Sequence, residues 1–344
     1  MSTDSTRQRT RYQILRVLRK APTSLWGLFR AQDANLSEAI RTITTMLTSK
    51  EIVFDEERRK FSLHNDVPIL SDVNGRCPTC EGKGMILGGR FEETLKRFSQ
   101  LTADRPPPDF AYNQGIIDSR DLALKAAVMD RRGDLEGRSV LLLGDDDLFS
   151  IYLACLELSC RVTVLEIDTR LIGYINEKTE NHGLAITARQ YDVNASLPND
   201  LRGACDVFVT EPPEGLKGML LFLRRAVESL GMGGSGYFGL TTLESSLSKW
   251  LAIQRFLVKR KMVTTDLLRD FSLYPESGDP VDDYTVFPIS RQLPVHPGPP
   301  DRDYFRSSLI RVENTEQCTM EDSGGLYTDQ DTWVTLDPEG ENAG

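Results

Sequence analysis

The 344-residue chain lacks any run of about 18 apolar residues, the length that a membrane-spanning helix needs. Its first residues, "MSTDSTRQRTRYQ", lack the apolar stretch of a secretion signal. We therefore expect no membrane span and a cytoplasmic location. The length and the 40% hydrophobic content are sufficient for two domains with sizeable cores.

Cysteines are few, and only Cys77 and Cys80 of the six, in "RCPTCEGKGM", are spaced like metal ligands. Such a knuckle presents two thiolates to one ion, which predicts a structural zinc or iron site. Four ligands close a zinc site, and the sequence offers only His64 and His182 as weak further candidates. The alternatives are two subunits that pool their cysteines, or a reduced turn without metal. We expect the other cysteines to be reduced core residues.

Positive charge is scarce outside the N-terminal part. Residues 1–64 contain 12 basic and 7 acidic residues, a charge of +5, whereas the rest contains 29 basic and 44 acidic residues, a charge of −15. A strongly acidic region attracts cations and repels phosphates. The balance favours a cationic small molecule as the ligand, and nucleic acid is not expected as a partner.

Residues 1–66 predict a winged helix. Three stretches have helical spacing of apolar residues, and a charged hairpin follows: "RYQILRVLRK", "SLWGLFRAQ", "SEAIRTITTMLTSK" and "EIVFDEERRKFSL". Ser37 is the expected N-cap of the third helix. Because only Arg41 and Lys50 are basic on that helix, a protein-contact or dimerisation role is favoured over DNA binding.

Two connecting segments complete the predicted domain organisation. Residues 67–117 contain the cysteine knuckle, the short helix "FEETLKRFSQL" and the proline linker "TADRPPPDF". Residues 315–344 are polar and acidic, and we expect a flexible tail there.

Residues 118–314 alternate between short apolar strands and helices, after a first helix that Asp118 or Ser119 caps. The expected strands of the alternating part are "VLLLG", "RVTVLEID", "ITARQYDVN", "CDVFVTEPP" and "GSGYFGL". The stretches "TTDLLRDFSLYP" and "YFRSSLIRVE" are expected to close the sheet. This pattern predicts an α/β fold, a Rossmann-like, doubly wound sheet of the class I methyltransferase type.

In such a sheet the ligand lies at the carboxyl ends of the strands. Glu166 lies 22 residues after Gly144, where a carboxylate accepts hydrogen bonds from ribose hydroxyls, and Asp168 is the near alternative. Asp192, at the end of the third strand, is placed to accept from an adenine amino group. These residues predict a binding site for an S-adenosyl nucleoside.

Only one glycine, Gly144, follows the first strand, and Asp145, Asp146 and Asp147 come next. Three carboxylates there would repel the carboxylate of an ordinary methyl donor, but they would attract a bare aminopropyl ammonium beside a sulfonium. The expected donor is therefore decarboxylated S-adenosylmethionine, with an amine as nucleophile. An aliphatic amine attacks only when neutral, so a carboxylate must take its proton. We expect one of the three aspartates to do so, with Glu211 as the second choice.

The motifs "CPTCEGKG", "GDLEGRSVLLLGDDDLFSI" and "EPP", together with the N-terminal part, resemble the branched-chain polyamine synthases, or N(4)-bis(aminopropyl)spermidine synthases. The resemblance covers nearly the whole chain. It implies an aminopropyltransferase that forms homodimers and adds aminopropyl groups from decarboxylated S-adenosylmethionine to the secondary amine of spermidine. It places the catalytic aspartate within Gly144 to Asp147, and Gln114, Pro212 and Pro213 at the substrate. It also implies that the C-terminal tail assists catalysis.

Two positions depart from the family pattern. Glu211 stands where the family has aspartate in D-P-P, and Asn113 stands where it has an acid before Gln114. Glutamate moves the carboxylate by about one methylene, and Asn113 removes a charge, so the acceptor or the activity is expected to differ.

Two other functions stay open from the sequence. A nucleic-acid methyltransferase would suit a winged helix, and "EPP" is similar to the N-P-P-aromatic motif that holds a flipped base. Against it, Glu211 replaces the amide and Glu214 replaces the aromatic residue. The second is a winged-helix regulator whose α/β domain senses a polyamine.

Overall fold

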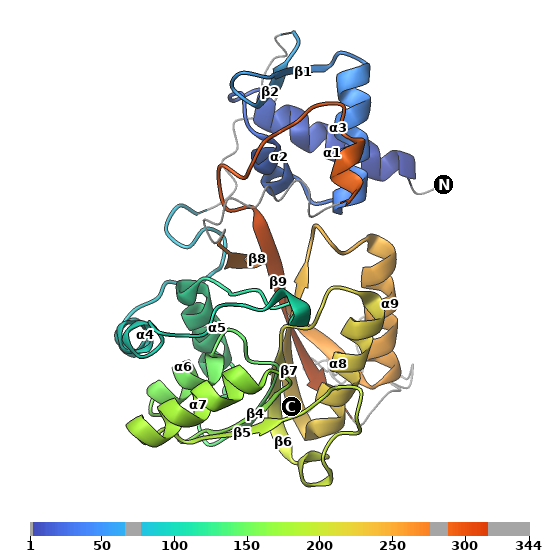
Figure 1. Cartoon of the computed structure of the whole chain (residues 1–344). Helices are drawn as coiled ribbons and strands as arrows, with labels where there is room; N and C mark the ends of the chain where they lie inside the picture. The colour runs from blue at the N-terminus through green and yellow to red at the C-terminus, as the bar shows by residue number, and fades with distance from the viewer. Residues whose placement is uncertain (1–2, 66–76, 276–287, 316–344) are drawn as a thin grey trace, which may run out of the picture.

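The structure is a computed structural model that describes residues 3–65, 77–275 and 288–315 (Figure 1). None of the helices in these ranges is long and apolar enough to cross a membrane. The predicted tail, with Cys318, lies outside the described residues except for Thr315.

The N-terminal unit has the elements α1 (Thr3–Leu18), α2 (Leu25–Ala31), α3 (Leu36–Thr48), β1 (Ile52–Asp55) and β2 (Lys60–Leu63). The helices and the antiparallel hairpin follow one another in the predicted order, and the assignment to the winged-helix class stays a prediction. The expected N-cap of α3 was wrong. Asn35 caps it by accepting a hydrogen bond from the Glu38 N–H at 3.0 Å, because the helix begins before Ser37.

A segment distant in sequence completes this N-terminal unit. It contains η4 (Pro288–Gln292), which lies beside α3, and it runs on to the last strand of the sheet (Figure 1). Leu293 and Tyr304 join the buried core of the unit, with the Tyr304 ring 4.5 Å from that of Trp26. The unit therefore draws on residues beyond the predicted range 1–66.

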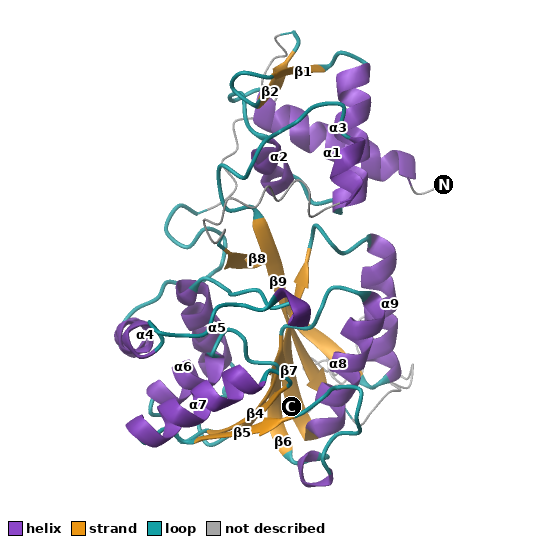
Figure 2. Cartoon of the chain, viewed as in Figure 1, coloured by secondary structure: helices purple, strands orange, loops and turns teal. Residues whose placement is uncertain are grey.

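The larger unit is a seven-stranded sheet between two layers of helices (Figure 2). Its strands are β3 (Ser139–Leu143), β4 (Arg161–Glu166), β5 (Ile186–Gln190), β6 (Cys205–Thr210), β7 (Leu230–Thr241), β8 (Met262–Tyr274) and β9 (Phe305–Asn314). The order is β5-β4-β3-β6-β7-β9-β8. The first five strands in that order are parallel, and β9 runs antiparallel to both neighbours.

Helices cover both faces of the sheet because both faces of its strands are apolar. One face carries α5 (Ser119–Arg131), α6 (Phe149–Cys155), α7 (Thr169–His182) and, outside them, α4 (Arg90–Leu101). The other carries α8 (Leu216–Ser229) and α9 (Leu247–Lys259). Asp118 caps α5, as one of the two predicted candidates. The predicted doubly wound α/β fold is confirmed, with the two last strands closing the sheet.

The strand order reverses between β3 and β6. The chain leaves β3 toward β4 and β5 on one side and returns to β6 on the other. Loops after β3 and β6 therefore diverge and leave a crevice at their carboxyl ends, where open α/β sheets bind their ligands.

Candidate active site

The turn after β3 separates the three aspartates. Gly144 has φ +78°, a left-handed conformation that glycine adopts without strain, so the chain bends sharply after the buried strand. Asp145 and Asp147 are buried after this bend, and Asp146 alone is partly exposed. The turn thus presents one of the three carboxylates outward.

Asp145 and Asp147 are used to hold the surrounding loops. The Asp145 carboxylate accepts hydrogen bonds from the backbone N–H and the hydroxyl of Ser150 at the start of α6, and burial raises its pKa to about 8. The Asp147 carboxylate accepts from the Ile117 N–H at 2.6 Å. Burial raises the pKa of Asp147 to about 6, although the Lys125 ammonium opposes the shift.

Asp146 faces a cavity at the carboxyl ends of the strands. One of its carboxylate oxygens accepts a hydrogen bond from the Gly115 N–H at 2.9 Å. Burial, and then the neighbouring Asp147 carboxylate, raise the pKa of Asp146 well above its usual value. A carboxylate with a raised pKa accepts a proton readily, which is what a general base near neutral pH requires.

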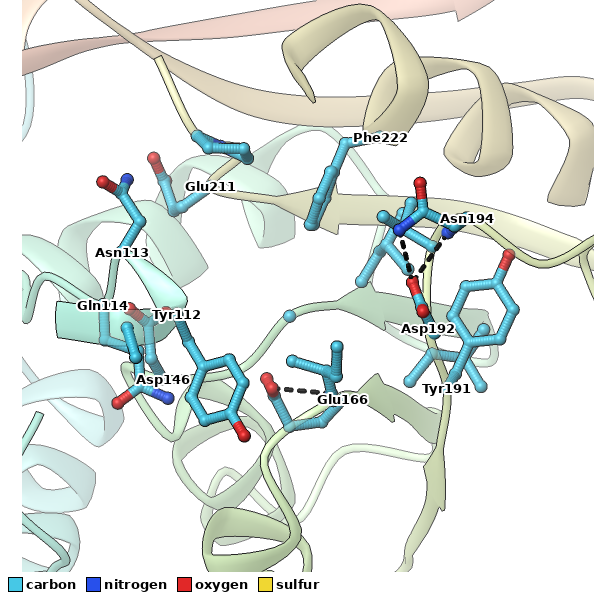
Figure 3. A pocket seen from close by; sticks show the side chains of 17 residues that line it. Tyr112, Asn113, Gln114, Asp146, Glu166, Tyr191, Asp192, Asn194, Glu211 and Phe222 are labelled. Carbon is cyan, nitrogen blue, oxygen red and sulfur yellow. Dashed lines mark hydrogen bonds between the residues drawn. The ribbon is translucent and has the colours of Figure 1, made fainter. Parts of the chain in front are cut away.

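The cavity has a volume of about 310 Å³, at the lower end of the range typical of small-molecule sites. Figure 3 shows that its walls come from the loop before α5, the ends of β3, β4, β5 and β6, and helix α8. Seven predicted site residues line it: Gln114, Gly144, Asp146, Glu166, Asp192, Glu211 and Pro213. Four predicted residues do not: Asp145, Asp147, Asp168 and Pro212.

Glu166 is the predicted ribose ligand, and it is mostly engaged by the backbone. Its carboxylate accepts hydrogen bonds from the N–H groups of Asp145, Ile167 and Asp168 at 2.8–2.9 Å. A carboxylate has about four acceptor positions, so about one is left for a ligand. Glu166 thus ties the ends of β3 and β4 together and can accept from one hydroxyl.

Asp168, the alternative ribose ligand, is turned away from the cavity. Its carboxylate caps α7 through the Arg170 N–H, pairs with the Arg170 guanidinium at 2.6 Å and accepts from the Gln114 amide at 3.0 Å. The Gln114 carbonyl oxygen in turn accepts from the Asp109 N–H at 2.7 Å. Gln114 therefore borders the cavity with both ends of its amide already engaged.

Asp192 lies across the cavity from Asp146, after β5 (Figure 3). The side chain is exposed, and one carboxylate oxygen accepts two hydrogen bonds from Asn194, from its N–H and its side-chain amide, both at 2.9 Å. The other oxygen is available to a donor in the cavity. The rings of Tyr191 and Phe222 lie at the same end of the cavity.

Glu211, directly after β6, is held by side chains from two other elements. One carboxylate oxygen lies 2.5 Å from the Lys125 ammonium of α5, and the other accepts a hydrogen bond from the Tyr274 hydroxyl of β8 at 3.2 Å. Gly239 of β7 leaves space for this carboxylate, because a Cβ there would lie 1.7 Å from the second oxygen. The longer arm of glutamate is thus accommodated by a glycine on the neighbouring strand.

Sequence reasoning missed several residues of this site. Tyr112, Phe222 and Lys125 lie far in sequence from the strand ends that border the cavity, and Tyr274 ends β8 at the edge of the sheet. The topology alone brings them together. The helical period of α8 predicts an inward face, but it does not show that Phe222 lines a cavity rather than the core. The only available signal for Lys125 was a lysine within the apolar stretch "LALKAAV".

Glu214 occupies the position where a base-flipping methyltransferase carries its aromatic residue. Its carboxylate accepts from the Thr241 N–H and the Ser245 hydroxyl, both at 2.8 Å, and Lys249 lies 3.9 Å away. Glu214 thus connects the loop after β6 to the end of β7 and to the loop that follows it. It offers no ring on which a flipped base could stack.

Neither residue of the cysteine pair lines the cavity. Cys77 is exposed and Cys80 is partly buried, and both are free thiols, as are the buried Cys155, Cys160 and Cys205. Within the described ranges no group of three or more His, Cys, Asp and Glu side chains could hold a metal ion. A metal at the pair stays a prediction, and its further ligands would come from outside these ranges or from a second copy.

Comparison with known proteins gives a consistent result. A family model described as the C-terminal domain of branched-chain polyamine synthase A matches residues 93–334. An N(4)-bis(aminopropyl)spermidine synthase of Methanocaldococcus jannaschii is 34% identical over 86% of this chain and 81% of the relative. The protein of the same name from Thermococcus kodakarensis is 30% identical to this chain, over 92% of each of the two chains.

A solved structure shows the same overall arrangement. It is the C9 mutein of the branched-chain polyamine synthase of Thermus thermophilus, in complex with N4-aminopropylspermidine and 5'-methylthioadenosine. The structure has a TM-score of 0.78 and a sequence identity of 28%, covering 94% of this chain and 92% of that chain.

Proposed function

This chain belongs to the branched-chain polyamine synthase family, and from that premise we propose the reaction that its cavity performs. The protein is an aminopropyltransferase that uses decarboxylated S-adenosylmethionine as donor. The acceptor is a polyamine, spermidine at its secondary amine, and the products are a branched polyamine and methylthioadenosine. The names of the relatives, and the two molecules bound to the Thermus enzyme, support this reaction.

The observation that carries the proposal is the environment of Asp146. Its carboxylate faces the cavity, and no Lys, Arg or His among the described residues forms an ion pair with it. A cationic ligand would supply the partner that this carboxylate lacks, because opposite charges attract strongly in a cleft that is partly shielded from water. Both substrates of the proposed reaction are cations.

The proposed step is a displacement at the propyl carbon next to sulfur. The amine lone pair forms the new C–N bond while the C–S bond breaks, and its electrons neutralise the sulfonium as methylthioadenosine leaves. The acceptor amine has a pKa of about 10 in water, so it arrives as an ammonium. Asp146 takes that proton before or during attack, and we assign it the role of general base.

The residues at the other end of the cavity suit the nucleoside of the donor. Asp192 has a free carboxylate oxygen for the adenine amino group, and Glu166 has about one acceptor position left for a ribose hydroxyl. Phe222 supplies an apolar wall. We propose that these residues fix the donor with its sulfonium toward Asp146.

Glu211 and Asn113 lie on the side of the cavity where Asp146 is found (Figure 3). We propose that this side binds the acceptor and that Glu211 accepts hydrogen bonds from its ammonium groups. Asn113 is exposed at the rim and offers an amide where the family has an acid. The acceptor therefore meets one charge fewer at the rim than it would in a relative with the family pattern.

The test is a product assay by mass spectrometry with purified protein, decarboxylated S-adenosylmethionine and spermidine. We expect methylthioadenosine and a polyamine heavier by one or two aminopropyl groups, with fragments that place them on the secondary amine. Linear products would overturn the assignment to the secondary amine. Absence of methylthioadenosine with spermidine and with shorter and longer polyamines would overturn the proposed function.

A further inference from the structure

Lys125 is one of the largest fully buried side chains of the protein, with 1% of its side chain exposed. A buried lysine is rare, because removing an ammonium from water costs several kcal/mol unless a partner offsets it. Its partner is Glu211, a residue of the cavity wall, at 2.5 Å. A costly buried charge beside a reaction centre needs a reason beyond packing.

The surroundings keep Lys125 charged. Its ammonium lies 5.5 Å from the centre of the Phe149 ring, a favourable cation–π arrangement. Burial by itself lowers the pKa of Lys125, but the carboxylates of Glu211 and Asp147 outweigh it and raise that pKa. The residue therefore contributes a fixed positive charge at neutral pH.

The titratable groups that face this pair come from several elements. They are Asp146 and Asp147 after β3, Glu166 at the end of β4, Arg105 before η1 (Phe110–Tyr112), and Tyr274 of β8. Three of them are carboxylic acids, so Lys125 offsets part of a concentrated negative charge. Without it, mutual repulsion would favour protonation of the carboxylates that the proposed reaction needs ionised.

The contacts also fix the position of the Glu211 carboxylate. Lys125 holds one oxygen, the Tyr274 hydroxyl holds the other, and Gly239 leaves the space. Each oxygen has about two acceptor positions, so roughly one on each stays open toward the cavity. A glutamate with a free arm would adopt several rotamers, whereas this one is confined to a single place.

We propose that Lys125 is a positioning residue for aminopropyl transfer, which acts by holding the Glu211 carboxylate where it orients the acceptor amine. This inference rests on the proposed function. Lys125 touches neither substrate, and its effect passes through Glu211. The pairing also explains how glutamate serves at a position where the family pattern has aspartate, because the lysine and the glycine set where the longer arm ends.

The test compares the variants Lys125→Met and Glu211→Gln, and the two combined, in steady-state kinetics with decarboxylated S-adenosylmethionine and spermidine. We expect Lys125→Met to lower kcat about a hundredfold, because a misplaced orienting group costs that much. The acidic limb of the pH–activity profile should also move to higher pH in this variant. The Lys125 ammonium lowers the pKa of Asp147, so its loss raises that pKa. The double variant should be within about threefold of Glu211→Gln, because both changes remove one interaction.

A matched control is Lys178→Met. Lys178 of α7 is also mostly buried, pairs with Asp104 at 2.8 Å and lies 4.8 Å from the centre of the Tyr174 ring, but it does not line the cavity. Its loss should lower the melting temperature and leave kcat and the pH profile of the folded protein unchanged.

Three results would overturn the inference: an unchanged kcat in Lys125→Met, an unshifted pH profile, or a double variant at least tenfold slower than Glu211→Gln. If Lys125→Met does not fold, the test becomes the kcat of the double variant compared with that of Glu211→Gln. The double variant removes both partners of the buried ion pair, so neither partner is left as an unpaired buried charge. A wild-type protein without turnover overturns the proposed function itself, which separates that failure from a failure of the role of Lys125.

Discussion

The two ends of the cavity are built by different means. At the end where we propose that the nucleoside binds, called the nucleoside end, the Glu166 carboxylate is held by three backbone N–H groups, and Asp192 is held by a turn two residues long. At the end where we propose that the acceptor binds, called the amine end, Glu211 is held by side chains from separate elements, Lys125 and Tyr274. The first end is therefore set by the local fold, and the second by long-range packing.

This difference shows where specificity can change. Backbone hydrogen bonds survive most substitutions, so the nucleoside end can keep its geometry while the sequence varies. The amine end depends on a few side chains that fit one another, as Glu211 fits Gly239. A substitution there therefore needs compensation from a neighbouring residue.

The largest effect is expected from Asp146→Asn at the amine end. The amide cannot take the proton of the acceptor, so kcat should fall about a thousandfold, within the range for loss of a general base. Release of methylthioadenosine measures it, and circular dichroism checks the fold. The comparison variant is Asp145→Asn, whose side chain is turned toward Ser150. If Asp145→Asn lost more activity than Asp146→Asn, the assignment of the base would be wrong.

Gly239→Ala is expected to lower kcat about a hundredfold, because the new Cβ displaces the Glu211 carboxylate. The shorter Glu211→Asp should tolerate that alanine better than the wild-type glutamate does. We therefore expect Gly239→Ala to cost less activity in the Glu211→Asp background than alone, as measured by a double-mutant cycle. Additive losses would show that the two residues do not depend on each other.

At the nucleoside end, Asp192→Ala is expected to raise the KM for the donor about tenfold with little change in kcat. The loss of one hydrogen bond to a charged group corresponds to about that factor. Initial rates at varied donor concentration and saturating spermidine measure it. A change confined to the KM for spermidine would place Asp192 at the acceptor and contradict the division of the cavity.

The smallest effect is proton release when spermidine binds without donor. In the free protein, burial raises the pKa of Asp147 to about 6 and that of Asp146 well above its usual value, so both carboxylates bind protons at higher pH than an ordinary aspartate does. A bound cation favours the ionised form and lowers those pKa values, so a fraction of a proton should leave. Calorimetry in two buffers of different ionisation enthalpy measures it. Uptake of protons on binding, or a proton release from Asp146→Asn equal to that of the wild type, would contradict the expected lowering of these pKa values.

The sequence predicted the part of the molecule that follows local rules. Strand and helix periodicity located the sheet, and strand ends located Gly144, Asp146, Glu166 and Asp192 at one cavity. The same rule could not tell which of the three aspartates faces the cavity, because that depends on the turn that Gly144 makes.

Long-range packing accounts for what the sequence did not predict. Lys125 and Tyr274 are 86 and 63 residues away from Glu211 in the sequence. The periodicity of apolar residues carries no information about such long-range contacts. The same holds for the segment around Tyr304, which returns from the sheet to pack on Trp26. Asp168 fitted the expected position of a ribose ligand, but its partner Arg170 turns it away.

The proposed function is tested most directly by the affinity of the free enzyme for two donors, decarboxylated S-adenosylmethionine and the ordinary carboxylated form, measured by calorimetry. We expect the decarboxylated donor to bind at least tenfold more tightly, because the acidic turn after β3 repels the additional carboxylate. We also expect Asp146→Asn to reduce this difference in affinity between the two donors. Equal affinities, or a preference for the carboxylated donor, would contradict aminopropyl transfer and favour methyl transfer.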